Sequence, residues 1–96
     1  MSDIARIQTL PDRLLARIID APQRVWTPVD FVDIGSRAAV DKALQRMVMS
    51  GQLRRIQRGL YDKPSHNAFT GKPTVPDYRA VIDAIARRDQ VRWLID

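Results

Sequence analysis

Cysteine and glutamate are both absent from this 96-residue sequence, and histidine occurs only once. Without cysteine the chain forms neither disulfides nor thiolate metal sites, a composition that fits a reducing cytoplasm. The lone His66 does not provide the usual zinc ligand set. We therefore expect a cytoplasmic protein that holds no metal and no cofactor.

Long apolar runs are missing as well. No stretch approaches the roughly 20 apolar residues that a membrane span requires. The first ten residues, MSDIARIQTL, contain an early aspartate and lack the continuous apolar core of a signal peptide. The sequence thus predicts a soluble protein without an anchor, and a chain of this length suits a single domain.

Arginine is what the chain has in excess. It contains 13 Arg and 3 Lys against 11 acidic residues, all of them Asp, and its formal net charge is +5. Arginine pairs bidentately with phosphate or with guanine, whereas lysine acts as a point charge, so this bias favours a nucleic-acid partner. A bias in genomic base composition would produce the same excess.

The stretch from Gly35 to Lys63, GSRAAVDKALQRMVMSGQLRRIQRGLYDK, organises the chain. Ser36 is a favourable N-cap, and the apolar residues behind it recur at the three- and four-residue spacing of one helical face. Gly51 then ends this helix in the left-handed conformation that glycine adopts without a Cβ penalty. We interpret the segment as a recognition helix whose buried face consists of Val40, Ala43, Leu44, Met47 and Val48.

A basic hairpin follows that helix directly. A short strand runs from Leu53 to the pair Arg58-Gly59, and Leu60-Tyr61 returns from it. A two-residue turn of this kind needs a positive φ, which Gly59 supplies. Strict alternation would put Leu53 and Ile56 on opposite faces, so either Leu53 precedes the strand or a bulge intervenes.

The net charge of the chain is concentrated in this helix and hairpin. Residues 36–63 hold seven basic and two acidic residues, while the rest of the chain holds nine of each and is neutral. An exposed helix usually carries both positively and negatively charged side chains. A localised excess of positive charge is the footprint expected of a phosphate-binding surface.

The segments before the helix complete a winged helix-turn-helix. A first helix is predicted at about 10–20, ended by Ala21-Pro22, with Ile4 and Ile7 continuing its apolar period. Residues 24–26 form a short strand that pairs with the wing. Thr27-Pro28 opens the second helix, because threonine caps and proline is tolerated at the first helical position. Residues 33–35 are the turn.

The end of the chain is predicted to lie apart from this unit. Residues 65–76 are rich in Gly, Pro, Thr and Ser and read as a linker. A further helix begins after it with an apolar stripe, and residues 90–95, QVRWLI, read as a strand. The predicted fold class is mainly α with a small β-hairpin, a winged helix-turn-helix followed by an extra C-terminal helix. Residues 1–64 form the DNA-binding domain, and residues 77–96 lead into a C-terminal domain beyond this chain.

Residues 24–95 resemble the N-terminal winged-helix domain of AbiEi-like antitoxins from type IV bacterial toxin–antitoxin systems. The matching strings are VWTPVDF at 25–31, GSRAAV at 35–40, ALQRM at 43–47, GQLRRI at 51–56, RGLYDKP at 58–64, TGK at 70–72, Pro76 and AIARR at 84–88. The resemblance implies a domain that binds operator DNA and represses its own operon. It also implies a larger C-terminal domain, outside this chain, that opposes a nucleotidyltransferase-like toxin. A homodimer on an inverted repeat would suit such an operator.

The predicted DNA-binding surface combines the exposed face of the recognition helix with the hairpin. Arg37, Ala38 and Gln45 lie where side chains of a recognition helix meet base edges. Arg54 and Arg58 are predicted phosphate or minor-groove contacts, and Arg55 either joins them or braces the sheet through a carboxylate. The full predicted set is Thr27, Ser36, Arg37, Ala38, Asp41, Lys42, Gln45, Arg46, Arg54, Arg55 and Arg58.

Two other functions stay open on the sequence alone. A winged helix can serve as a protein-interaction module, and the same basic wing could bind RNA. Catalysis is not expected, because no nucleophile, base and orienting group come together in the pattern. Trp26, Phe31 and Tyr61 could stack on single-stranded bases, but their apolar neighbours favour places in the core.

Overall fold

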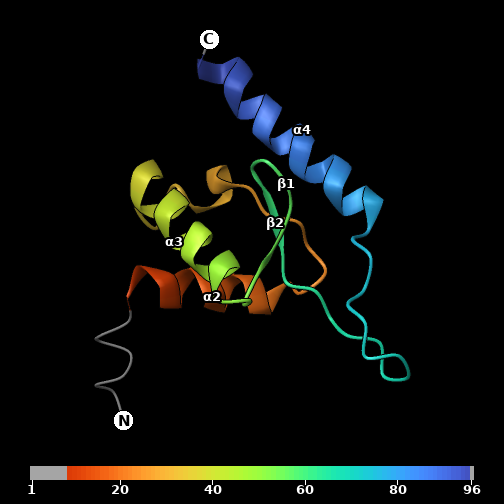
Figure 1. Ribbon diagram of the computed structural model, residues 1–96. Coiled ribbons are helices and arrows are strands. Elements are labelled where there is room, and N and C mark those ends of the chain that lie inside the picture. The colour runs from red at the N-terminus through yellow and green to blue at the C-terminus, as the bar shows by residue number, and fades with distance from the viewer. Residues whose placement is uncertain (1–8, 96) are drawn as a thin grey trace.

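The computed structural model describes residues 9–95; Ile4 and Ile7 lie outside them. The described residues form the helix α2 (Leu10–Asp20), the 3₁₀-helix η1 (Pro28–Phe31), the helix α3 (Arg37–Met49), the strands β1 (Arg54–Gln57) and β2 (Leu60–Asp62), and the helix α4 (Tyr78–Ile95) (Figure 1). The hairpin β1–β2 is antiparallel. The predicted fold class is confirmed: a winged helix-turn-helix followed by an extra C-terminal helix. Within residues 9–95, no helix has the length and apolarity needed to cross a bilayer.

Helix α2 has the predicted bounds because both of its ends are capped. The Thr9 hydroxyl accepts from the Asp12 backbone N–H at 3.3 Å, and the Asp12 carboxylate accepts from the Thr9 N–H at 3.2 Å. This reciprocal pair is a capping box. Ala21 ends the helix, and Leu14 and Ile18 face the core with no exposed surface.

The second helix of the motif is shorter than the sequence predicts, a 3₁₀-helix of four residues. In an α-helix the carbonyl of Asp30 would accept from the N–H of Ile34. Here that carbonyl accepts from Arg17 Nη1 at 2.9 Å, and Ile34 donates to Phe31 instead. The chain then turns at Gly35, where a Cβ would force the end of the Leu10 side chain to move.

The recognition helix and the wing form as predicted. The Ser36 hydroxyl accepts from the Ala39 N–H at 3.2 Å, and Gly51 and Gly59 adopt φ of 85° and 80°. Both explanations for the hairpin pattern hold. Leu53 is buried before β1 begins, and the register is irregular between Arg55 and Gln57, which is a bulge at Ile56.

The short strand predicted at 24–26 is reduced to one bridge with the wing. Trp26 donates its N–H to the Tyr61 carbonyl at 2.7 Å, and Tyr61 donates back at 2.9 Å. Trp26 also stacks on Phe31 with ring centroids 5.2 Å apart. Trp26 and Phe31 are core residues, as predicted, and Tyr61 packs against the same cluster while it stays half-buried.

The strand predicted at 90–95 is wrong, because α4 continues without interruption to Ile95. No glycine or proline follows Pro76, and seven of residues 77–96 are Ala or Arg, which favour a helix. Helix α4 also packs on the winged helix: Ala84 is fully buried in a cluster with Val25 and Leu60. The last helix therefore covers one side of the winged helix.

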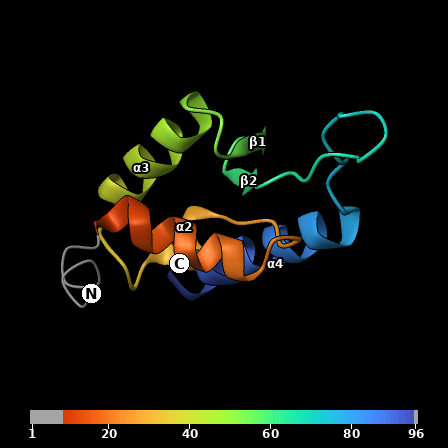
Figure 2. The same cartoon turned by 90° about the horizontal axis from the view of Figure 1, so that it is seen from below.

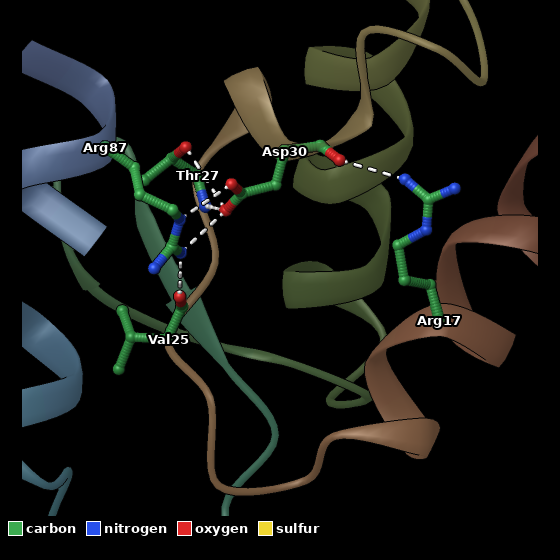
Figure 3. Close-up of polar contacts among 5 residues, drawn as sticks. All are labelled: Arg17, Val25, Thr27, Asp30 and Arg87. Carbon is green, nitrogen blue, oxygen red and sulfur yellow. Dashed lines mark hydrogen bonds and ion pairs between the residues drawn. The ribbon is translucent and has the colours of Figure 1, made fainter. Parts of the chain in front are cut away.

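A charged network fixes α4 to the helix-turn-helix (Figure 3). Arg87 Nε and Nη2 each donate to the Asp30 carboxylate at 2.9 Å, and Nη2 also donates to the Val25 carbonyl at 2.8 Å. The same carboxylate accepts from the Thr27 N–H at 2.9 Å. Arg17 of α2 binds the Asp30 carbonyl, and Arg87 of α4 binds the Asp30 carboxylate. Asp30 therefore connects α2, η1 and α4.

Replacing Arg87 with alanine is expected to lower the free energy of unfolding by about 2–4 kcal/mol, because the Asp30 carboxylate would lose its cation. The Asp30 side chain is only 9% exposed, so water would compensate little of that loss. Urea denaturation followed by circular dichroism measures the change. Arg79→Ala removes an exposed arginine of the same helix and should stay within about 0.5 kcal/mol of the wild type. Equal losses in both variants would contradict a linking role for Arg87.

Candidate nucleic-acid interface

A groove runs between α3 and the wing, with a volume of about 470 Å³. Pro28 and Tyr61 line it beside residues of the helix and of the hairpin. Five residues predicted to bind DNA come together here: Arg37, Asp41, Gln45, Arg55 and Arg58. Polar side chains of α3 and of the hairpin thus line the same groove.

The helix side of the groove begins at the capped N-terminus of α3. Arg37 Nε donates to both carboxylate oxygens of Asp41, each at 3.2 Å, one helical turn further on. This exposed pair holds the guanidinium along the helix and leaves its two terminal nitrogens outside the pair. Gln45 is exposed one turn beyond Asp41. The sequence order Arg37, Asp41, Gln45 therefore becomes a single row of polar groups.

The remaining predicted residues of α3 stand outside the groove. Ser36, Ala38, Lys42 and Arg46 are all exposed, but none of them lines it. They lie at the start of the helix or on its outer face.

The two neighbouring arginines of β1 have different roles, Arg54 within the protein and Arg55 at the groove. Arg54 donates through Nε and Nη2 to Asp62 at 3.0 and 2.7 Å, and through Nη1 to the Thr74 carbonyl at 2.7 Å. Hydrogen bonding to Asp62 raises the pKa of Arg54. The prediction that Arg54 is a free phosphate contact is wrong, because all three of its nitrogens are used within the protein. Arg55 is exposed and lines the groove.

Thr27 is also removed from the predicted surface. Its side chain has no exposed area, and its hydroxyl donates to the Asp30 carboxylate at 3.4 Å. A fully buried side chain cannot contact DNA. Thr27 instead stabilises the start of η1 by hydrogen bonding to Asp30.

Met49 is a groove residue that the sequence analysis missed. It is 82% exposed and lines the groove beside Val48. On the sequence alone, Met49 is assigned neither to the core nor to the DNA-binding surface. The available signal was spacing, because Met49 follows Gln45 by four residues and so shares its face.

A second ion pair fixes the turn that leads into α3. Arg17 donates from Nη1 and Nη2 to the Asp33 carboxylate at 2.8 and 2.7 Å. This hydrogen bonding is the main cause that lowers the pKa of Asp33 to about 2. Both partners are consequently charged at neutral pH, and the turn before Ser36 is tied to α2.

Comparison with known proteins finds one family. The model of a family of unknown function, DUF6088, matches residues 17–95. The match spans the second half of α2, the helix-turn-helix, the wing and α4, and so includes every residue that lines the groove. No curated protein and no solved structure matches the chain.

Arg54→Ala is expected to lower the free energy of unfolding by about 1.5–3 kcal/mol, the range for hydrogen bonds to charged groups, because Asp62 would lose its partner. Asp62 is 7% exposed and so depends on that partner. Arg55→Ala is the matched control and should change stability by no more than about 0.5 kcal/mol. Thermal or urea unfolding of the two variants provides the measurement. A larger loss in the Arg55 variant would reverse the assignment of roles.

Proposed function

We propose that this chain, which belongs to the DUF6088 family, binds duplex DNA through α3 and the β1–β2 wing. The observation that carries the proposal is the groove, where Arg37 and Gln45 of the helix face Arg55 and Arg58 of the hairpin. Guanidinium and amide groups are the side chains that pair with phosphates and with base edges. The chain would act in the cytoplasm.

The charge balance of the surface supports a polyanionic ligand. Both acidic residues of 36–63 have an arginine partner, Asp41 with Arg37 and Asp62 with Arg54. The basic residues left over are Lys42, Arg46, Arg55, Arg58 and Lys63, of which only Lys63 is half-buried. Their number equals the net charge of the whole chain. A surface with this excess attracts DNA before any specific contact forms.

The geometry suits insertion of α3 into the major groove. Residues near the N-terminal end of a recognition helix meet base edges, so Arg37 and Ala38 would lie at the bases and Gln45 about two turns along. Arg55 and Arg58 then lie beside the helix, where a wing meets phosphates or the adjacent minor groove. Lys42 and Arg46 on the outer face would contact the opposite backbone.

In the cell, we propose that the chain binds operator DNA and represses its own operon. These two roles follow from the resemblance to AbiEi-like antitoxins, as do the antitoxin role and the toxin partner, whereas DNA binding is also supported by the groove. A gel shift with the DNA upstream of the chain's own gene tests the proposal. Steep salt dependence would distinguish it from a protein-docking role, and failure of structured RNA to compete would distinguish it from RNA binding.

Base readout is expected to depend on α3. Arg37→Ala and Gln45→Ala should each weaken binding to the specific site by about 1–3 kcal/mol and weaken binding to random DNA much less. Arg79→Ala and Gln90→Ala are matched controls, since both side chains are exposed on α4. Titration of labelled duplexes by fluorescence anisotropy measures the difference. Equal losses on specific and random DNA would remove the two residues from base readout.

The wing is expected to set the salt dependence. Each phosphate neutralised contributes about 0.9 to the slope of log K against log salt, so an Arg55→Ala/Arg58→Ala double variant should flatten the slope by nearly two. An Arg13→Ala/Arg79→Ala variant removes the same charge from α2 and α4, where both arginines are exposed, and should keep the wild-type slope. If the two double variants show the same slope, the wing does not lie on the DNA.

A further inference from the structure

The segment between β2 and α4 is an ordered hairpin. We call residues 65–74 the distal loop. Its two sides are joined at the root, where Thr74 donates its N–H to the Ser65 carbonyl at 2.7 Å, and nearer the tip, where Asn67 donates to Lys72 at 2.8 Å. Gly71 closes the tip with a φ of 70° and donates to the Asn67 carbonyl at 2.8 Å. The segment read as a linker therefore has a defined shape.

The tip of the distal loop holds an aromatic side chain in solvent. The Asn67 side-chain oxygen accepts from the N–H groups of Phe69 and Thr70 at 2.8 and 3.1 Å, so these backbone donors are satisfied locally. Phe69 itself is 97% exposed. A phenylalanine that a preformed loop holds in solvent is a candidate contact residue for a binding partner. Because the loop is already ordered, less conformational entropy is lost on binding.

The wing determines where the distal loop points. Arg54 Nη1 donates to the Thr74 carbonyl at 2.7 Å while its other nitrogens hold Asp62 of β2. Figure 2 shows α3, the hairpin and the distal loop along one side of the molecule and α4 along the other. The molecule measures 43 by 40 by 21 Å, so its two longer dimensions each exceed one turn of B-DNA, roughly 34 Å.

The chemistry of the loop favours a nucleic acid over an apolar protein pocket. Residues 63–76 contain Lys63, His66 and Lys72 and no acidic residue. An exposed apolar ring beside a lysine matches the arrangement of minor-groove proteins, in which the ring separates base steps and basic side chains line the groove. A protein pocket would explain the ring but not the absence of negative charge.

We propose that the distal loop is a second DNA contact, in which Phe69 enters the minor groove beside the segment read by α3 and Lys72 pairs with a phosphate. The proposal rests on the proposed function, because it assumes that the α3 side of the molecule faces duplex DNA. Arg54 acts here as a positioning residue. It fixes the root of the loop to the wing, so that the two contacts keep a constant spacing along the duplex.

The test uses the full chain and a duplex of the DNA upstream of its own gene, with 2-aminopurine placed at successive positions of the flank. Phe69→Ala should lower the affinity about tenfold and abolish the rise in 2-aminopurine fluorescence that unstacking produces. It should also shorten the hydroxyl-radical footprint on one flank only. Lys72→Ala should flatten the salt slope by about 0.9. Val75→Ala is the matched control, an apolar residue 87% exposed just beyond the loop, and should bind as the wild type does.

Different failures have different meanings. If the wild-type chain binds duplex DNA and Phe69→Ala binds it with the same affinity and footprint, the distal loop is not a DNA contact, and Phe69 is then a candidate anchor for a protein. If the wild-type chain binds no duplex at all, the proposed function itself is wrong and this inference falls with it. Unchanged thermal unfolding of Phe69→Ala shows that any loss of affinity is not a loss of fold.

Discussion

The side chain of Asp30 places a carboxylate in the interior of a small protein, and three elements meet on that residue. An uncompensated charge at such a depth would be costly, yet Arg87 and Thr27 together supply four donors to its two oxygens. Its carbonyl accepts from Arg17 at the same time. The short helix η1, which packs against α3, is therefore fixed from both sides.

Two groups of arginines can be distinguished by what their side chains contact. Arg17, Arg54 and Arg87 each bind an aspartate with two nitrogens and hold elements together. Arg55 and Arg58 are exposed and line the groove. Composition alone does not separate these groups, because a guanidinium fork matches a carboxylate as well as it matches a phosphate.

Local signals gave most of the fold. The Ser36 cap, the glycines at 51 and 59 and the apolar face of α3 each depend on a few neighbouring residues, and each prediction is confirmed. The errors have two causes. Tertiary packing decides the second helix and Arg54, since a carbonyl taken by Arg17 shortens the helix and Asp62 binds the arginine across the hairpin. The strand predicted at 90–95 is a local error, because helix-favouring residues continue α4 to Ile95.

The candidate site was predictable to the extent that it is local. Helical spacing predicts that Arg37, Asp41 and Gln45 share one face of α3. The turn residues predict the hairpin that carries Arg55 and Arg58. Thr27 and Arg54 have partners close in sequence, Asp30 three residues on and Asp62 eight residues on. They were assigned wrongly because spacing alone does not show that Thr27 has no exposed area or that Arg54 binds a carboxylate. Met49 could have been found from its four-residue spacing after Gln45.

The sequence distance across the Asp30–Arg87 pair has a consequence for synthesis. The two residues lie 57 positions apart, and Val25 lies 62 positions before the same arginine. A chain leaving the ribosome therefore completes α2, α3 and the wing before the residue that anchors them has been translated. Until Arg87 emerges, the Asp30 carboxylate has only Thr27 among these partners. The residues of the basic surface are therefore translated before Arg87, whose ion pair with Asp30 completes the packing of the fold.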